Sequence, residues 1–266
     1  MSYDHAKNVG NKGYVWKHFI LLTLLRQLTE ERKSLSDRFR YFESHAGRGL
    51  YTLKEKGEWR QGIGRVTESP NLPREHPYFQ ILGTSITSGS NYLGSWLLVG
   101  KYLSNQRVPF RLLLCDTSQD VADAIRTEML DKEVRSAISF HQSDGFAKLG
   151  GHAGHDLVLV DPGYHPNAER DWAKCRQAAM HLEHTGTPFV IWYPVFWPTK
   201  PTKLVREPGL PGFEVLWAPM GQKPSQNQKG CGILAGRRSE KILRFLTTDL
   251  SAVAVLLSGE LFIREP

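Results

Sequence analysis

The sequence predicts an α/β protein built on a doubly wound, mostly parallel sheet. Three short runs are apolar on both faces: residues 110–115 (FRLLLC), 157–160 (LVLV) and 189–193 (FVIWY). Helical patterns at 118–130 and 170–182 separate these runs along the chain. Strands that are apolar on both faces and alternate with helices are typical of buried parallel strands joined by crossover helices.

The other elements follow the same rhythm. Apolar side chains at helical spacing predict a first helix over residues 14–32. Further strands are expected at 39–43, 137–140 and 213–217. The segment 53–88 is rich in glycine, proline and basic residues, so we expect a small insertion there. We therefore predict one domain over residues 1–266, with an N-terminal arm and helix in residues 1–35.

Composition limits the class of protein. Of the 266 residues, 40% are hydrophobic, which is enough for a sizeable core and excludes a disordered chain. The formal net charge of +7 suits a polyanionic partner without identifying one. The cysteines, Cys115, Cys175 and Cys231, lie far apart, so we expect neither a disulfide framework nor a metal site.

Membrane insertion is not expected from the apolar runs. The run at residues 19–25 is seven residues long and is followed by Arg26, whereas a membrane-spanning helix needs about 20 apolar residues. We predict a soluble, cytoplasmic protein and leave its oligomeric state open.

Ligands of open α/β sheets bind beyond the carboxyl ends of the strands, and four predicted strands end in suitable residues. The first leads into a glycine turn that contains His45 and Gly47, which admits a ligand close to the backbone or simply connects strand to helix. The second ends in Asp116, a ribose acceptor or a helix cap. The third leads to Asp144 and Gly145, where the carboxylate accepts from an adenine amine or caps a helix.

The fourth strand end is the most informative. The segment Asp161-Pro162-Gly163-Tyr164 follows the LVLV strand directly. The Asp161 carboxylate and the Pro162 carbonyl are placed to accept hydrogen bonds from an aromatic amine, and Tyr164 is placed to stack on its ring. The alternative is an ordinary turn with a surface tyrosine.

Together these segments resemble class I S-adenosylmethionine-dependent methyltransferases that act on amino groups, and more narrowly the RlmJ family, which methylates adenine N6 in large-subunit rRNA. The motifs that carry the resemblance run in order from residue 3 to residue 195. They are Tyr3-Asp4-His5-Ala6, Gly10-Asn11, Val15-Trp16-Lys17-His18, His45-Ala46-Gly47-Arg48-Gly49-Leu50-Tyr51, Gly89-Ser90, Asp144-Gly145-Phe146, Asp161-Pro162-Gly163-Tyr164 and Trp192-Tyr193-Pro194-Val195.

The resemblance implies a Rossmann-like fold, S-adenosylmethionine as cofactor and 23S rRNA, protein-free or partly assembled, as partner. The positions that it assigns to the cofactor are His18, His45, Gly47, Ser90, Asp116, Asp144, Gly145 and Asp161. Catalysis falls to Asp161, Pro162 and Tyr164, and substrate binding to Tyr3, His5, Lys17 and Tyr164. For His5 and Lys17 taken alone, a solvated tail or helix residue is the simpler interpretation.

Several positions depart from the family pattern. Gly163 stands where the family has a second proline, and Asp116 where it has glutamate. Two other functions stay open, a DNA adenine methyltransferase and a non-catalytic RNA-binding protein with the same fold. Basic residues of the insertion and of a later pair are phosphate contacts or plain surface charges: Lys54, Lys56, Arg60, Arg65, Arg74, Arg237 and Arg238.

Overall fold

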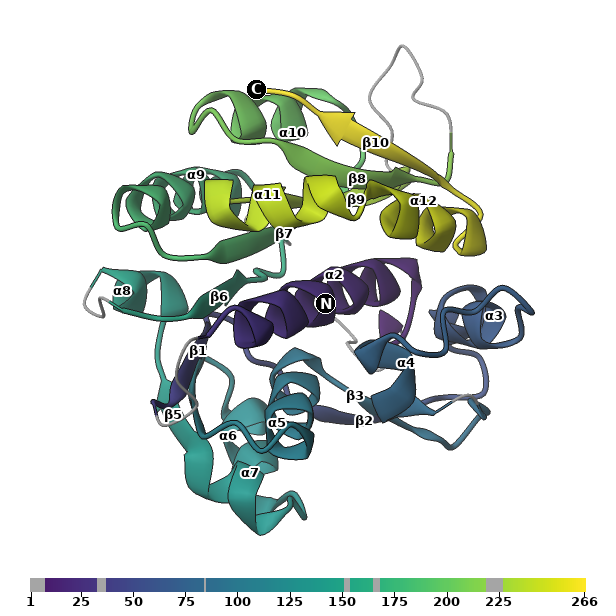
Figure 1. Cartoon of the computed structure of the whole chain (residues 1–266), viewed down its shortest axis with the longest axis vertical. Helices are drawn as coiled ribbons and strands as arrows, with labels where there is room; N and C mark the ends of the chain where they lie inside the picture. The colour runs from purple at the N-terminus through teal and green to yellow at the C-terminus, as the bar shows by residue number, and fades with distance from the viewer. Residues whose placement is uncertain (1–7, 33–36, 84, 151–153, 165–167, 219–226) are drawn as a thin grey trace.

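A computed structural model describes residues 8–32, 37–83, 85–150, 154–164, 168–218 and 227–266. Within these residues, eight strands form one sheet in the order β10-β8-β9-β7-β6-β1-β4-β5 (Figure 1). Their bounds are β1 Phe39–Glu43, β4 Phe110–Asp116, β5 Ile138–Gln142, β6 Leu157–Val160, β7 Phe189–Val195, β8 Gly212–Leu216, β9 Gly230–Ala235 and β10 Glu260–Arg264.

One half of the sheet is parallel and the other antiparallel. Strands β5, β4, β1, β6 and β7 pair in parallel, which confirms the five predicted strands in this half. The expectation of a parallel strand at 213–217 was wrong in its pairing. Strand β9 inserts between β7 and β8 and runs antiparallel to both, so β8 has antiparallel neighbours on both sides.

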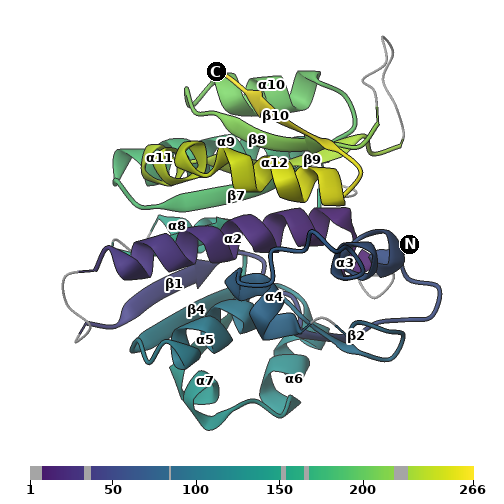
Figure 2. The same ribbon diagram turned by 45° about the vertical axis from the view of Figure 1, so that its right-hand side comes forward.

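Helices cover both faces of this sheet. Their bounds are α2 Lys12–Glu30, α3 Ile63–Thr67, α4 Pro77–Leu82, α5 Ser95–Asn105, α6 Gln119–Thr127, α7 Lys132–Ala137, α8 Gly145–Leu149, α9 Ala168–His184, α10 Thr199–Arg206, α11 Arg237–Phe245 and α12 Thr247–Leu256. Figure 2 shows α2 along the middle of the molecule, with α11 and α12 on one side and α4 and α5 on the other. On the opposite face, α9 and α10 pack against β7. The helix predicted at 118–130 is α6, which ends at Thr127, and a second short helix, α7, follows it.

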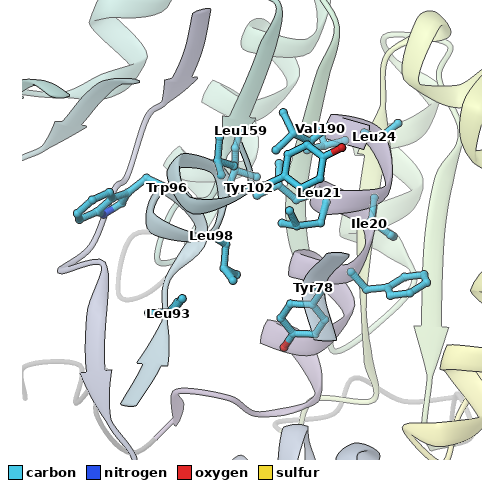
Figure 3. Close-up of a cluster of buried hydrophobic side chains, with 14 of the residues drawn as sticks. Ile20, Leu21, Leu24, Tyr78, Leu93, Trp96, Leu98, Tyr102, Leu159 and Val190 are labelled. Atoms are coloured by element: carbon cyan, nitrogen blue, oxygen red, sulfur yellow. The ribbon is translucent and has the colours of Figure 1, made fainter. Parts of the chain in front are cut away.

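The larger core surrounds α2. The Asn11 side chain caps this helix by accepting a hydrogen bond from the Tyr14 amide at 3.1 Å. Figure 3 shows α2 side chains such as Leu21 and Leu24 lying among buried side chains of α5, β6 and β7. Helix α2 is buried along most of its length and contacts β7 and β9 of the sheet. No described helix is long and apolar enough to span a bilayer.

The predicted insertion is bracketed by two short strands that the sequence reading missed. Strands β2 (Leu50–Thr52) and β3 (Asn91–Leu93) pair antiparallel as a separate two-stranded sheet. Between them lie the short helix η1 (Glu58–Gln61), α3 and α4. Helix α4 packs against α2, which joins this segment to the main core.

Candidate active site

The carboxyl ends of β4, β1 and β6 lie side by side, because these strands are adjacent and parallel. They bring together Asp116, the Ser44-His45 turn and Asp161. The backbone amide of Gly47 donates to Asp116 Oδ2 at 3.0 Å, which ties the first turn to the second strand. Three of the strand ends that the sequence predicted as the site therefore lie next to one another at one edge of the sheet.

A buried lysine meets Asp161 at this edge. Lys17 Nζ, from the start of α2, lies 2.5 Å from Asp161 Oδ2, and its side chain is 6% exposed. The same ammonium lies 4.5 Å from the centre of the Tyr14 ring. Lys17 is therefore a partner of Asp161, and the interpretation of a solvated helix residue does not hold.

Glu43 completes this charged group, and the sequence reading missed it. This carboxyl at the end of β1 is fully buried and accepts hydrogen bonds from Tyr41 and Ser95. Burial raises its pKa to about 8, and the negative charge of Asp161 adds to the rise, while Lys17 and both hydrogen bonds oppose it. An acidic residue at the end of a mostly aromatic strand, two positions before His45, was the available signal.

His45 lies in a strongly acidic surrounding. Its ring is mostly buried, and burial lowers its pKa, against the pull of four carboxylates, Asp161, Asp116, Asp171 and Asp144. Its Nδ1 lies 2.7 Å from the Ser44 hydroxyl, and its ring meets Phe146 edge to face at 5.0 Å. The centre of the site therefore combines a neutral imidazole with four carboxylates, of which Asp161 and Asp144 are paired with lysines, and the remaining excess of negative charge suits a cationic ligand.

Asp116 and Asp144 both serve the local fold. Asp116 Oδ1 accepts from the Ser118 amide at 2.9 Å. Asp144 Oδ1 accepts from the Phe146 amide at 3.0 Å and so caps α8, while Oδ2 binds Lys174 Nζ at 2.6 Å. The helix-cap interpretation therefore holds for Asp144. A carboxylate has about four acceptor positions, so each retains capacity for a ligand.

Glycines allow the turns to approach each other closely. Gly47 has a φ of +62°, a conformation that a side chain disfavours. A Cβ at Gly145 would lie 2.0 Å from the Ser44 carbonyl oxygen, so the start of α8 contacts the first turn directly. Only glycine allows that contact.

His18 is buried within α2 and close to the edge. Its Nδ1 lies 3.0 Å from the Tyr92 hydroxyl, and the two rings stack at 5.8 Å. Its Nε2 is buried and has no hydrogen-bond partner in the described structure. Burial and the adjacent Lys17 lower the pKa of His18 well below its ordinary value. A neutral imidazole with one unused nitrogen is suited to a ligand contact.

The prediction that the Tyr164 ring stacks on a bound amine was wrong. Tyr164 has a φ of +52°, and its ring packs between Trp172 and Trp192 in a second, smaller cluster of buried apolar residues. Its hydroxyl donates a hydrogen bond to the Trp192 carbonyl at 2.8 Å. With 6% exposure the ring offers no stacking face. Tyr164 therefore anchors the turn that carries Asp161 and the buried Pro162, because its ring is fixed to β7.

The remaining predicted positions are Ser90, the arm residues Tyr3 and His5, and the basic pair Arg237 and Arg238. Ser90 Oγ accepts from the Thr87 amide at 3.0 Å within its own turn, and its carbonyl accepts from Leu53. Tyr3 and His5 lie outside the described residues. The basic pair is neutralised, since Arg237 lies 3.3 Å from Glu183 and Arg238 lies 3.2 Å from Glu31.

The arrangement fits the S-adenosylmethionine that the sequence resemblance implies. Carboxylates at the ends of β4 and after β5 suit hydroxyl and amine donors, and the acidic surrounding of His45 suits a sulfonium and an ammonium group. The Nε2 of His18 has no hydrogen-bond partner in the described structure. The described residues contain no group of three or more His, Cys, Asp or Glu side chains placed to hold a metal ion.

Comparison with known proteins gives three related results. A family model described as ribosomal RNA large subunit methyltransferase D, RlmJ, matches residues 36–232. Proteins named ribosomal RNA large subunit methyltransferase J, from Haemophilus influenzae and Escherichia coli, are 27% and 26% identical to this chain, each over 86% of it and 83% of the relative. A crystal structure of a Legionella pneumophila protein has the same fold, with a TM-score of 0.75 at 23% identity, covering 97% of this chain and 98% of that one.

Proposed function

This chain belongs to the RlmJ family of ribosomal RNA large subunit methyltransferases, and we propose that it methylates N6 of an adenine in 23S rRNA, with S-adenosylmethionine as methyl donor. The observation that carries the assignment of the reacting centre is the buried Lys17–Asp161 pair at the carboxyl end of β6. It holds one carboxylate at the edge where class I folds bind ligands.

Asp161 and Pro162 position the reacting amine. Lys17 holds Oδ2, so Oδ1 of Asp161 is left to accept one N6 hydrogen, and the Pro162 carbonyl accepts the other. Two such acceptors hold the nitrogen lone pair out of conjugation with the ring and direct it at the methyl group. When bound, S-adenosylmethionine supplies an electrophilic methyl group. After transfer, the proton released from N6 passes to Asp161 or to water.

Positioning supplies most of the rate enhancement. A reacting pair held about 3–3.5 Å apart and in line gains several kcal/mol over free encounter. The buried ion pair supports this alignment, because a carboxylate fixed by Lys17 does not reorient when the substrate arrives. In this proposal Tyr164 keeps the turn in place through the Trp192 carbonyl.

The proposed cofactor contacts are the positions that the sequence resemblance assigns to S-adenosylmethionine. They are His18, His45, Gly47, Ser90, Asp116, Asp144, Gly145 and Asp161. Tyr3 and His5 stay predicted substrate contacts of the N-terminal arm. A stacked and paired adenine cannot reach Asp161, so the target adenine must be unpaired or flipped out. Protein-free or partly assembled rRNA in the cytoplasm is the substrate that meets this requirement.

The test compares two nucleic acids and two variants. Wild-type protein, Asp161→Asn and Lys101→Met are each incubated with methyl-labelled S-adenosylmethionine and either protein-free large-subunit rRNA or adenine-containing duplex DNA. The exposed Lys101–Asp131 pair makes Lys101→Met a control far from the reacting centre. We expect N6-methyladenosine in RNA alone, formed by wild type and the control but lost in Asp161→Asn, which keeps most of its cofactor affinity through the other proposed contacts.

Other outcomes would change the assignment. Methylation of the duplex DNA instead of the RNA would favour the DNA adenine methyltransferase. RNA binding without methyl transfer by the wild type would favour the non-catalytic RNA-binding protein. Full activity of Asp161→Asn would remove Asp161 from the mechanism.

A further inference from the structure

The sheet face opposite α2 is exposed at Arg40 of β1 and Arg111 of β4 and half-buried along most of β5, whereas Phe42 and Cys115 on the same face are buried. On β1, β4 and β5, one set of alternating side chains, such as Leu112 and Phe140, packs toward the larger core. The other set contains Arg40, Arg111 and His141. Since neighbours on one face of a strand are two residues apart, these three side chains lie on the face that the larger core does not use.

This face is exposed because the segment that connects β5 to β6 covers little of it. Helices α9 and α10 cover β7, while in the described part of the segment from β5 to β6, residues 143–150 and 154–156, the one helix is the five-residue α8. A cavity of about 290 Å³ lies beside it, lined by Arg40, Arg111, Ser139, His141, Gly154 and His155, among others. That volume is near the lower end for ligand sites and matches part of a nucleotide.

The two arginines are direct neighbours. Arg40 and Arg111 are register partners in the parallel pairing of β1 and β4. Like charges in this position repel each other unless an anion lies between them. Arg40 Nε lies 4.0 Å from Asp156, at the limit of an ion pair, and Arg111 is exposed without an ion pair to any described carboxylate. This differs from Arg237 and Arg238, which are both paired.

The guanidinium of Arg40 lies close to the backbone of Gly154. A Cβ at Gly154 would lie 2.9 Å from Arg40 Nη2, and Gly154 has a φ of +93°. The Arg40 head group therefore lies against the backbone of the β5–β6 connection. Planar guanidinium groups suit the oxygens of a phosphate, to which they donate two hydrogen bonds at once.

We propose that this basic cleft, formed by Arg40, Arg111 and His141, binds the phosphate backbone of the rRNA that flanks the target adenine. The inference rests on the proposed function, because it extends the same substrate away from the reacting edge. Arg40 lies three residues before the end of β1, so the cleft begins roughly 10 Å from that edge. Nearby nucleotides of one RNA strand span such a distance.

The test measures RNA binding as a function of salt. The variant Arg40→Gln/Arg111→Gln is compared with Arg126→Gln/Arg206→Gln, which removes two exposed arginines from α6 and α10. The single variant Arg111→Gln guards against a folding defect, and the melting temperature of each is recorded. Affinity for a protein-free 23S rRNA fragment is measured by fluorescence anisotropy over a range of salt concentrations.

We expect the cleft variant to bind RNA at least tenfold more weakly at low salt. Its slope of log affinity against log salt should fall by about 1.4–1.8, because each lost phosphate contact removes about 0.7–0.9. The Arg111→Gln variant should lose about half of that slope. A cleft variant with the affinity and slope of the control, in a protein that still methylates the RNA, overturns this inference alone. A wild-type protein that neither binds nor methylates RNA overturns the proposed function as well.

Discussion

Replacing Glu43 with glutamine tests the electrostatics of the site. In the folded protein the pKa of Glu43 is about 8, against an ordinary value of 4.5. Because the folded-state pKa is the higher one, the folded state favours the protonated carboxyl. The stability that this contributes is complete below about pH 4.5 and is lost as the pH rises through about 8.

The size of the loss follows from the two pKa values. Linkage of a single group with these values predicts that the folded protein loses about 1.4 kcal/mol between about pH 7 and about pH 9. The full penalty well above pH 8 approaches about 5 kcal/mol. Glutamine is neutral at every pH and still hydrogen-bonds Tyr41 and Ser95, so Glu43→Gln should lack this part of the pH dependence.

Urea unfolding at both pH values measures the difference. The free energy of unfolding of the wild type should fall by about 1.4 kcal/mol more than that of Glu43→Gln over this range. The exposed substitution Glu68→Gln serves as the control and should behave like the wild type. Equal pH slopes for the wild type and Glu43→Gln would show that Glu43 titrates normally, and the account of a buried, protonated carboxyl would be wrong.

Three further predictions follow from other contacts. Lys17→Met should lower kcat about a hundredfold at saturating substrates, because Asp161 loses its fixed position, whereas Lys101→Met should leave kcat unchanged; equal rates would refute the positioning role. Gly145→Ala should destabilise the protein by about 1–3 kcal/mol through its clash with Ser44, and Gly163→Ala, which meets no atom within 4 Å, should not; thermal melts of both decide it. Glu214→Ala should lower the free energy of unfolding in urea by about 3–5 kcal/mol. The mostly buried Arg264, which lies 2.6 Å from Glu214, would then lack its carboxylate partner, and adding Arg264→Met should recover part of the loss.

Most of the parallel half of the sheet was predictable because its signals are local. Strands buried on both faces need near-continuous apolar runs. The sequence contains such runs at β4, β6 and β7, so these strands were predicted. Strand β9 is not, because its run begins with two glycines around Cys231 and its place between β7 and β8 depends on pairing partners. Pairing is a long-range property, which is why β9, β10 and the antiparallel pairing of the predicted strand β8 were missed.

The site shows the same division. Strand-end positions are local, so Asp116 and Asp161 were found as the last or next residue of apolar runs. The orientation of Tyr164 is not local, since its positive φ is stabilised by the hydrogen bond to Trp192, 28 residues away. The sequence predicted that the Tyr164 ring faces a ligand, whereas the structure buries the ring in the core.

The sequence by itself determined which residues end the parallel strands and therefore which chemistry is available at the carboxyl edge. The physical reason is that burial and turn formation constrain residue types within a few positions of each strand. Only the tertiary structure decided that Lys17, from a helix far from β6 in the chain, becomes the buried partner of Asp161, and that Glu43 lies close enough to feel both charges. Charge pairing in a buried site depends on distances of a few ångströms between distant segments, and packing of α2 across the sheet sets those distances.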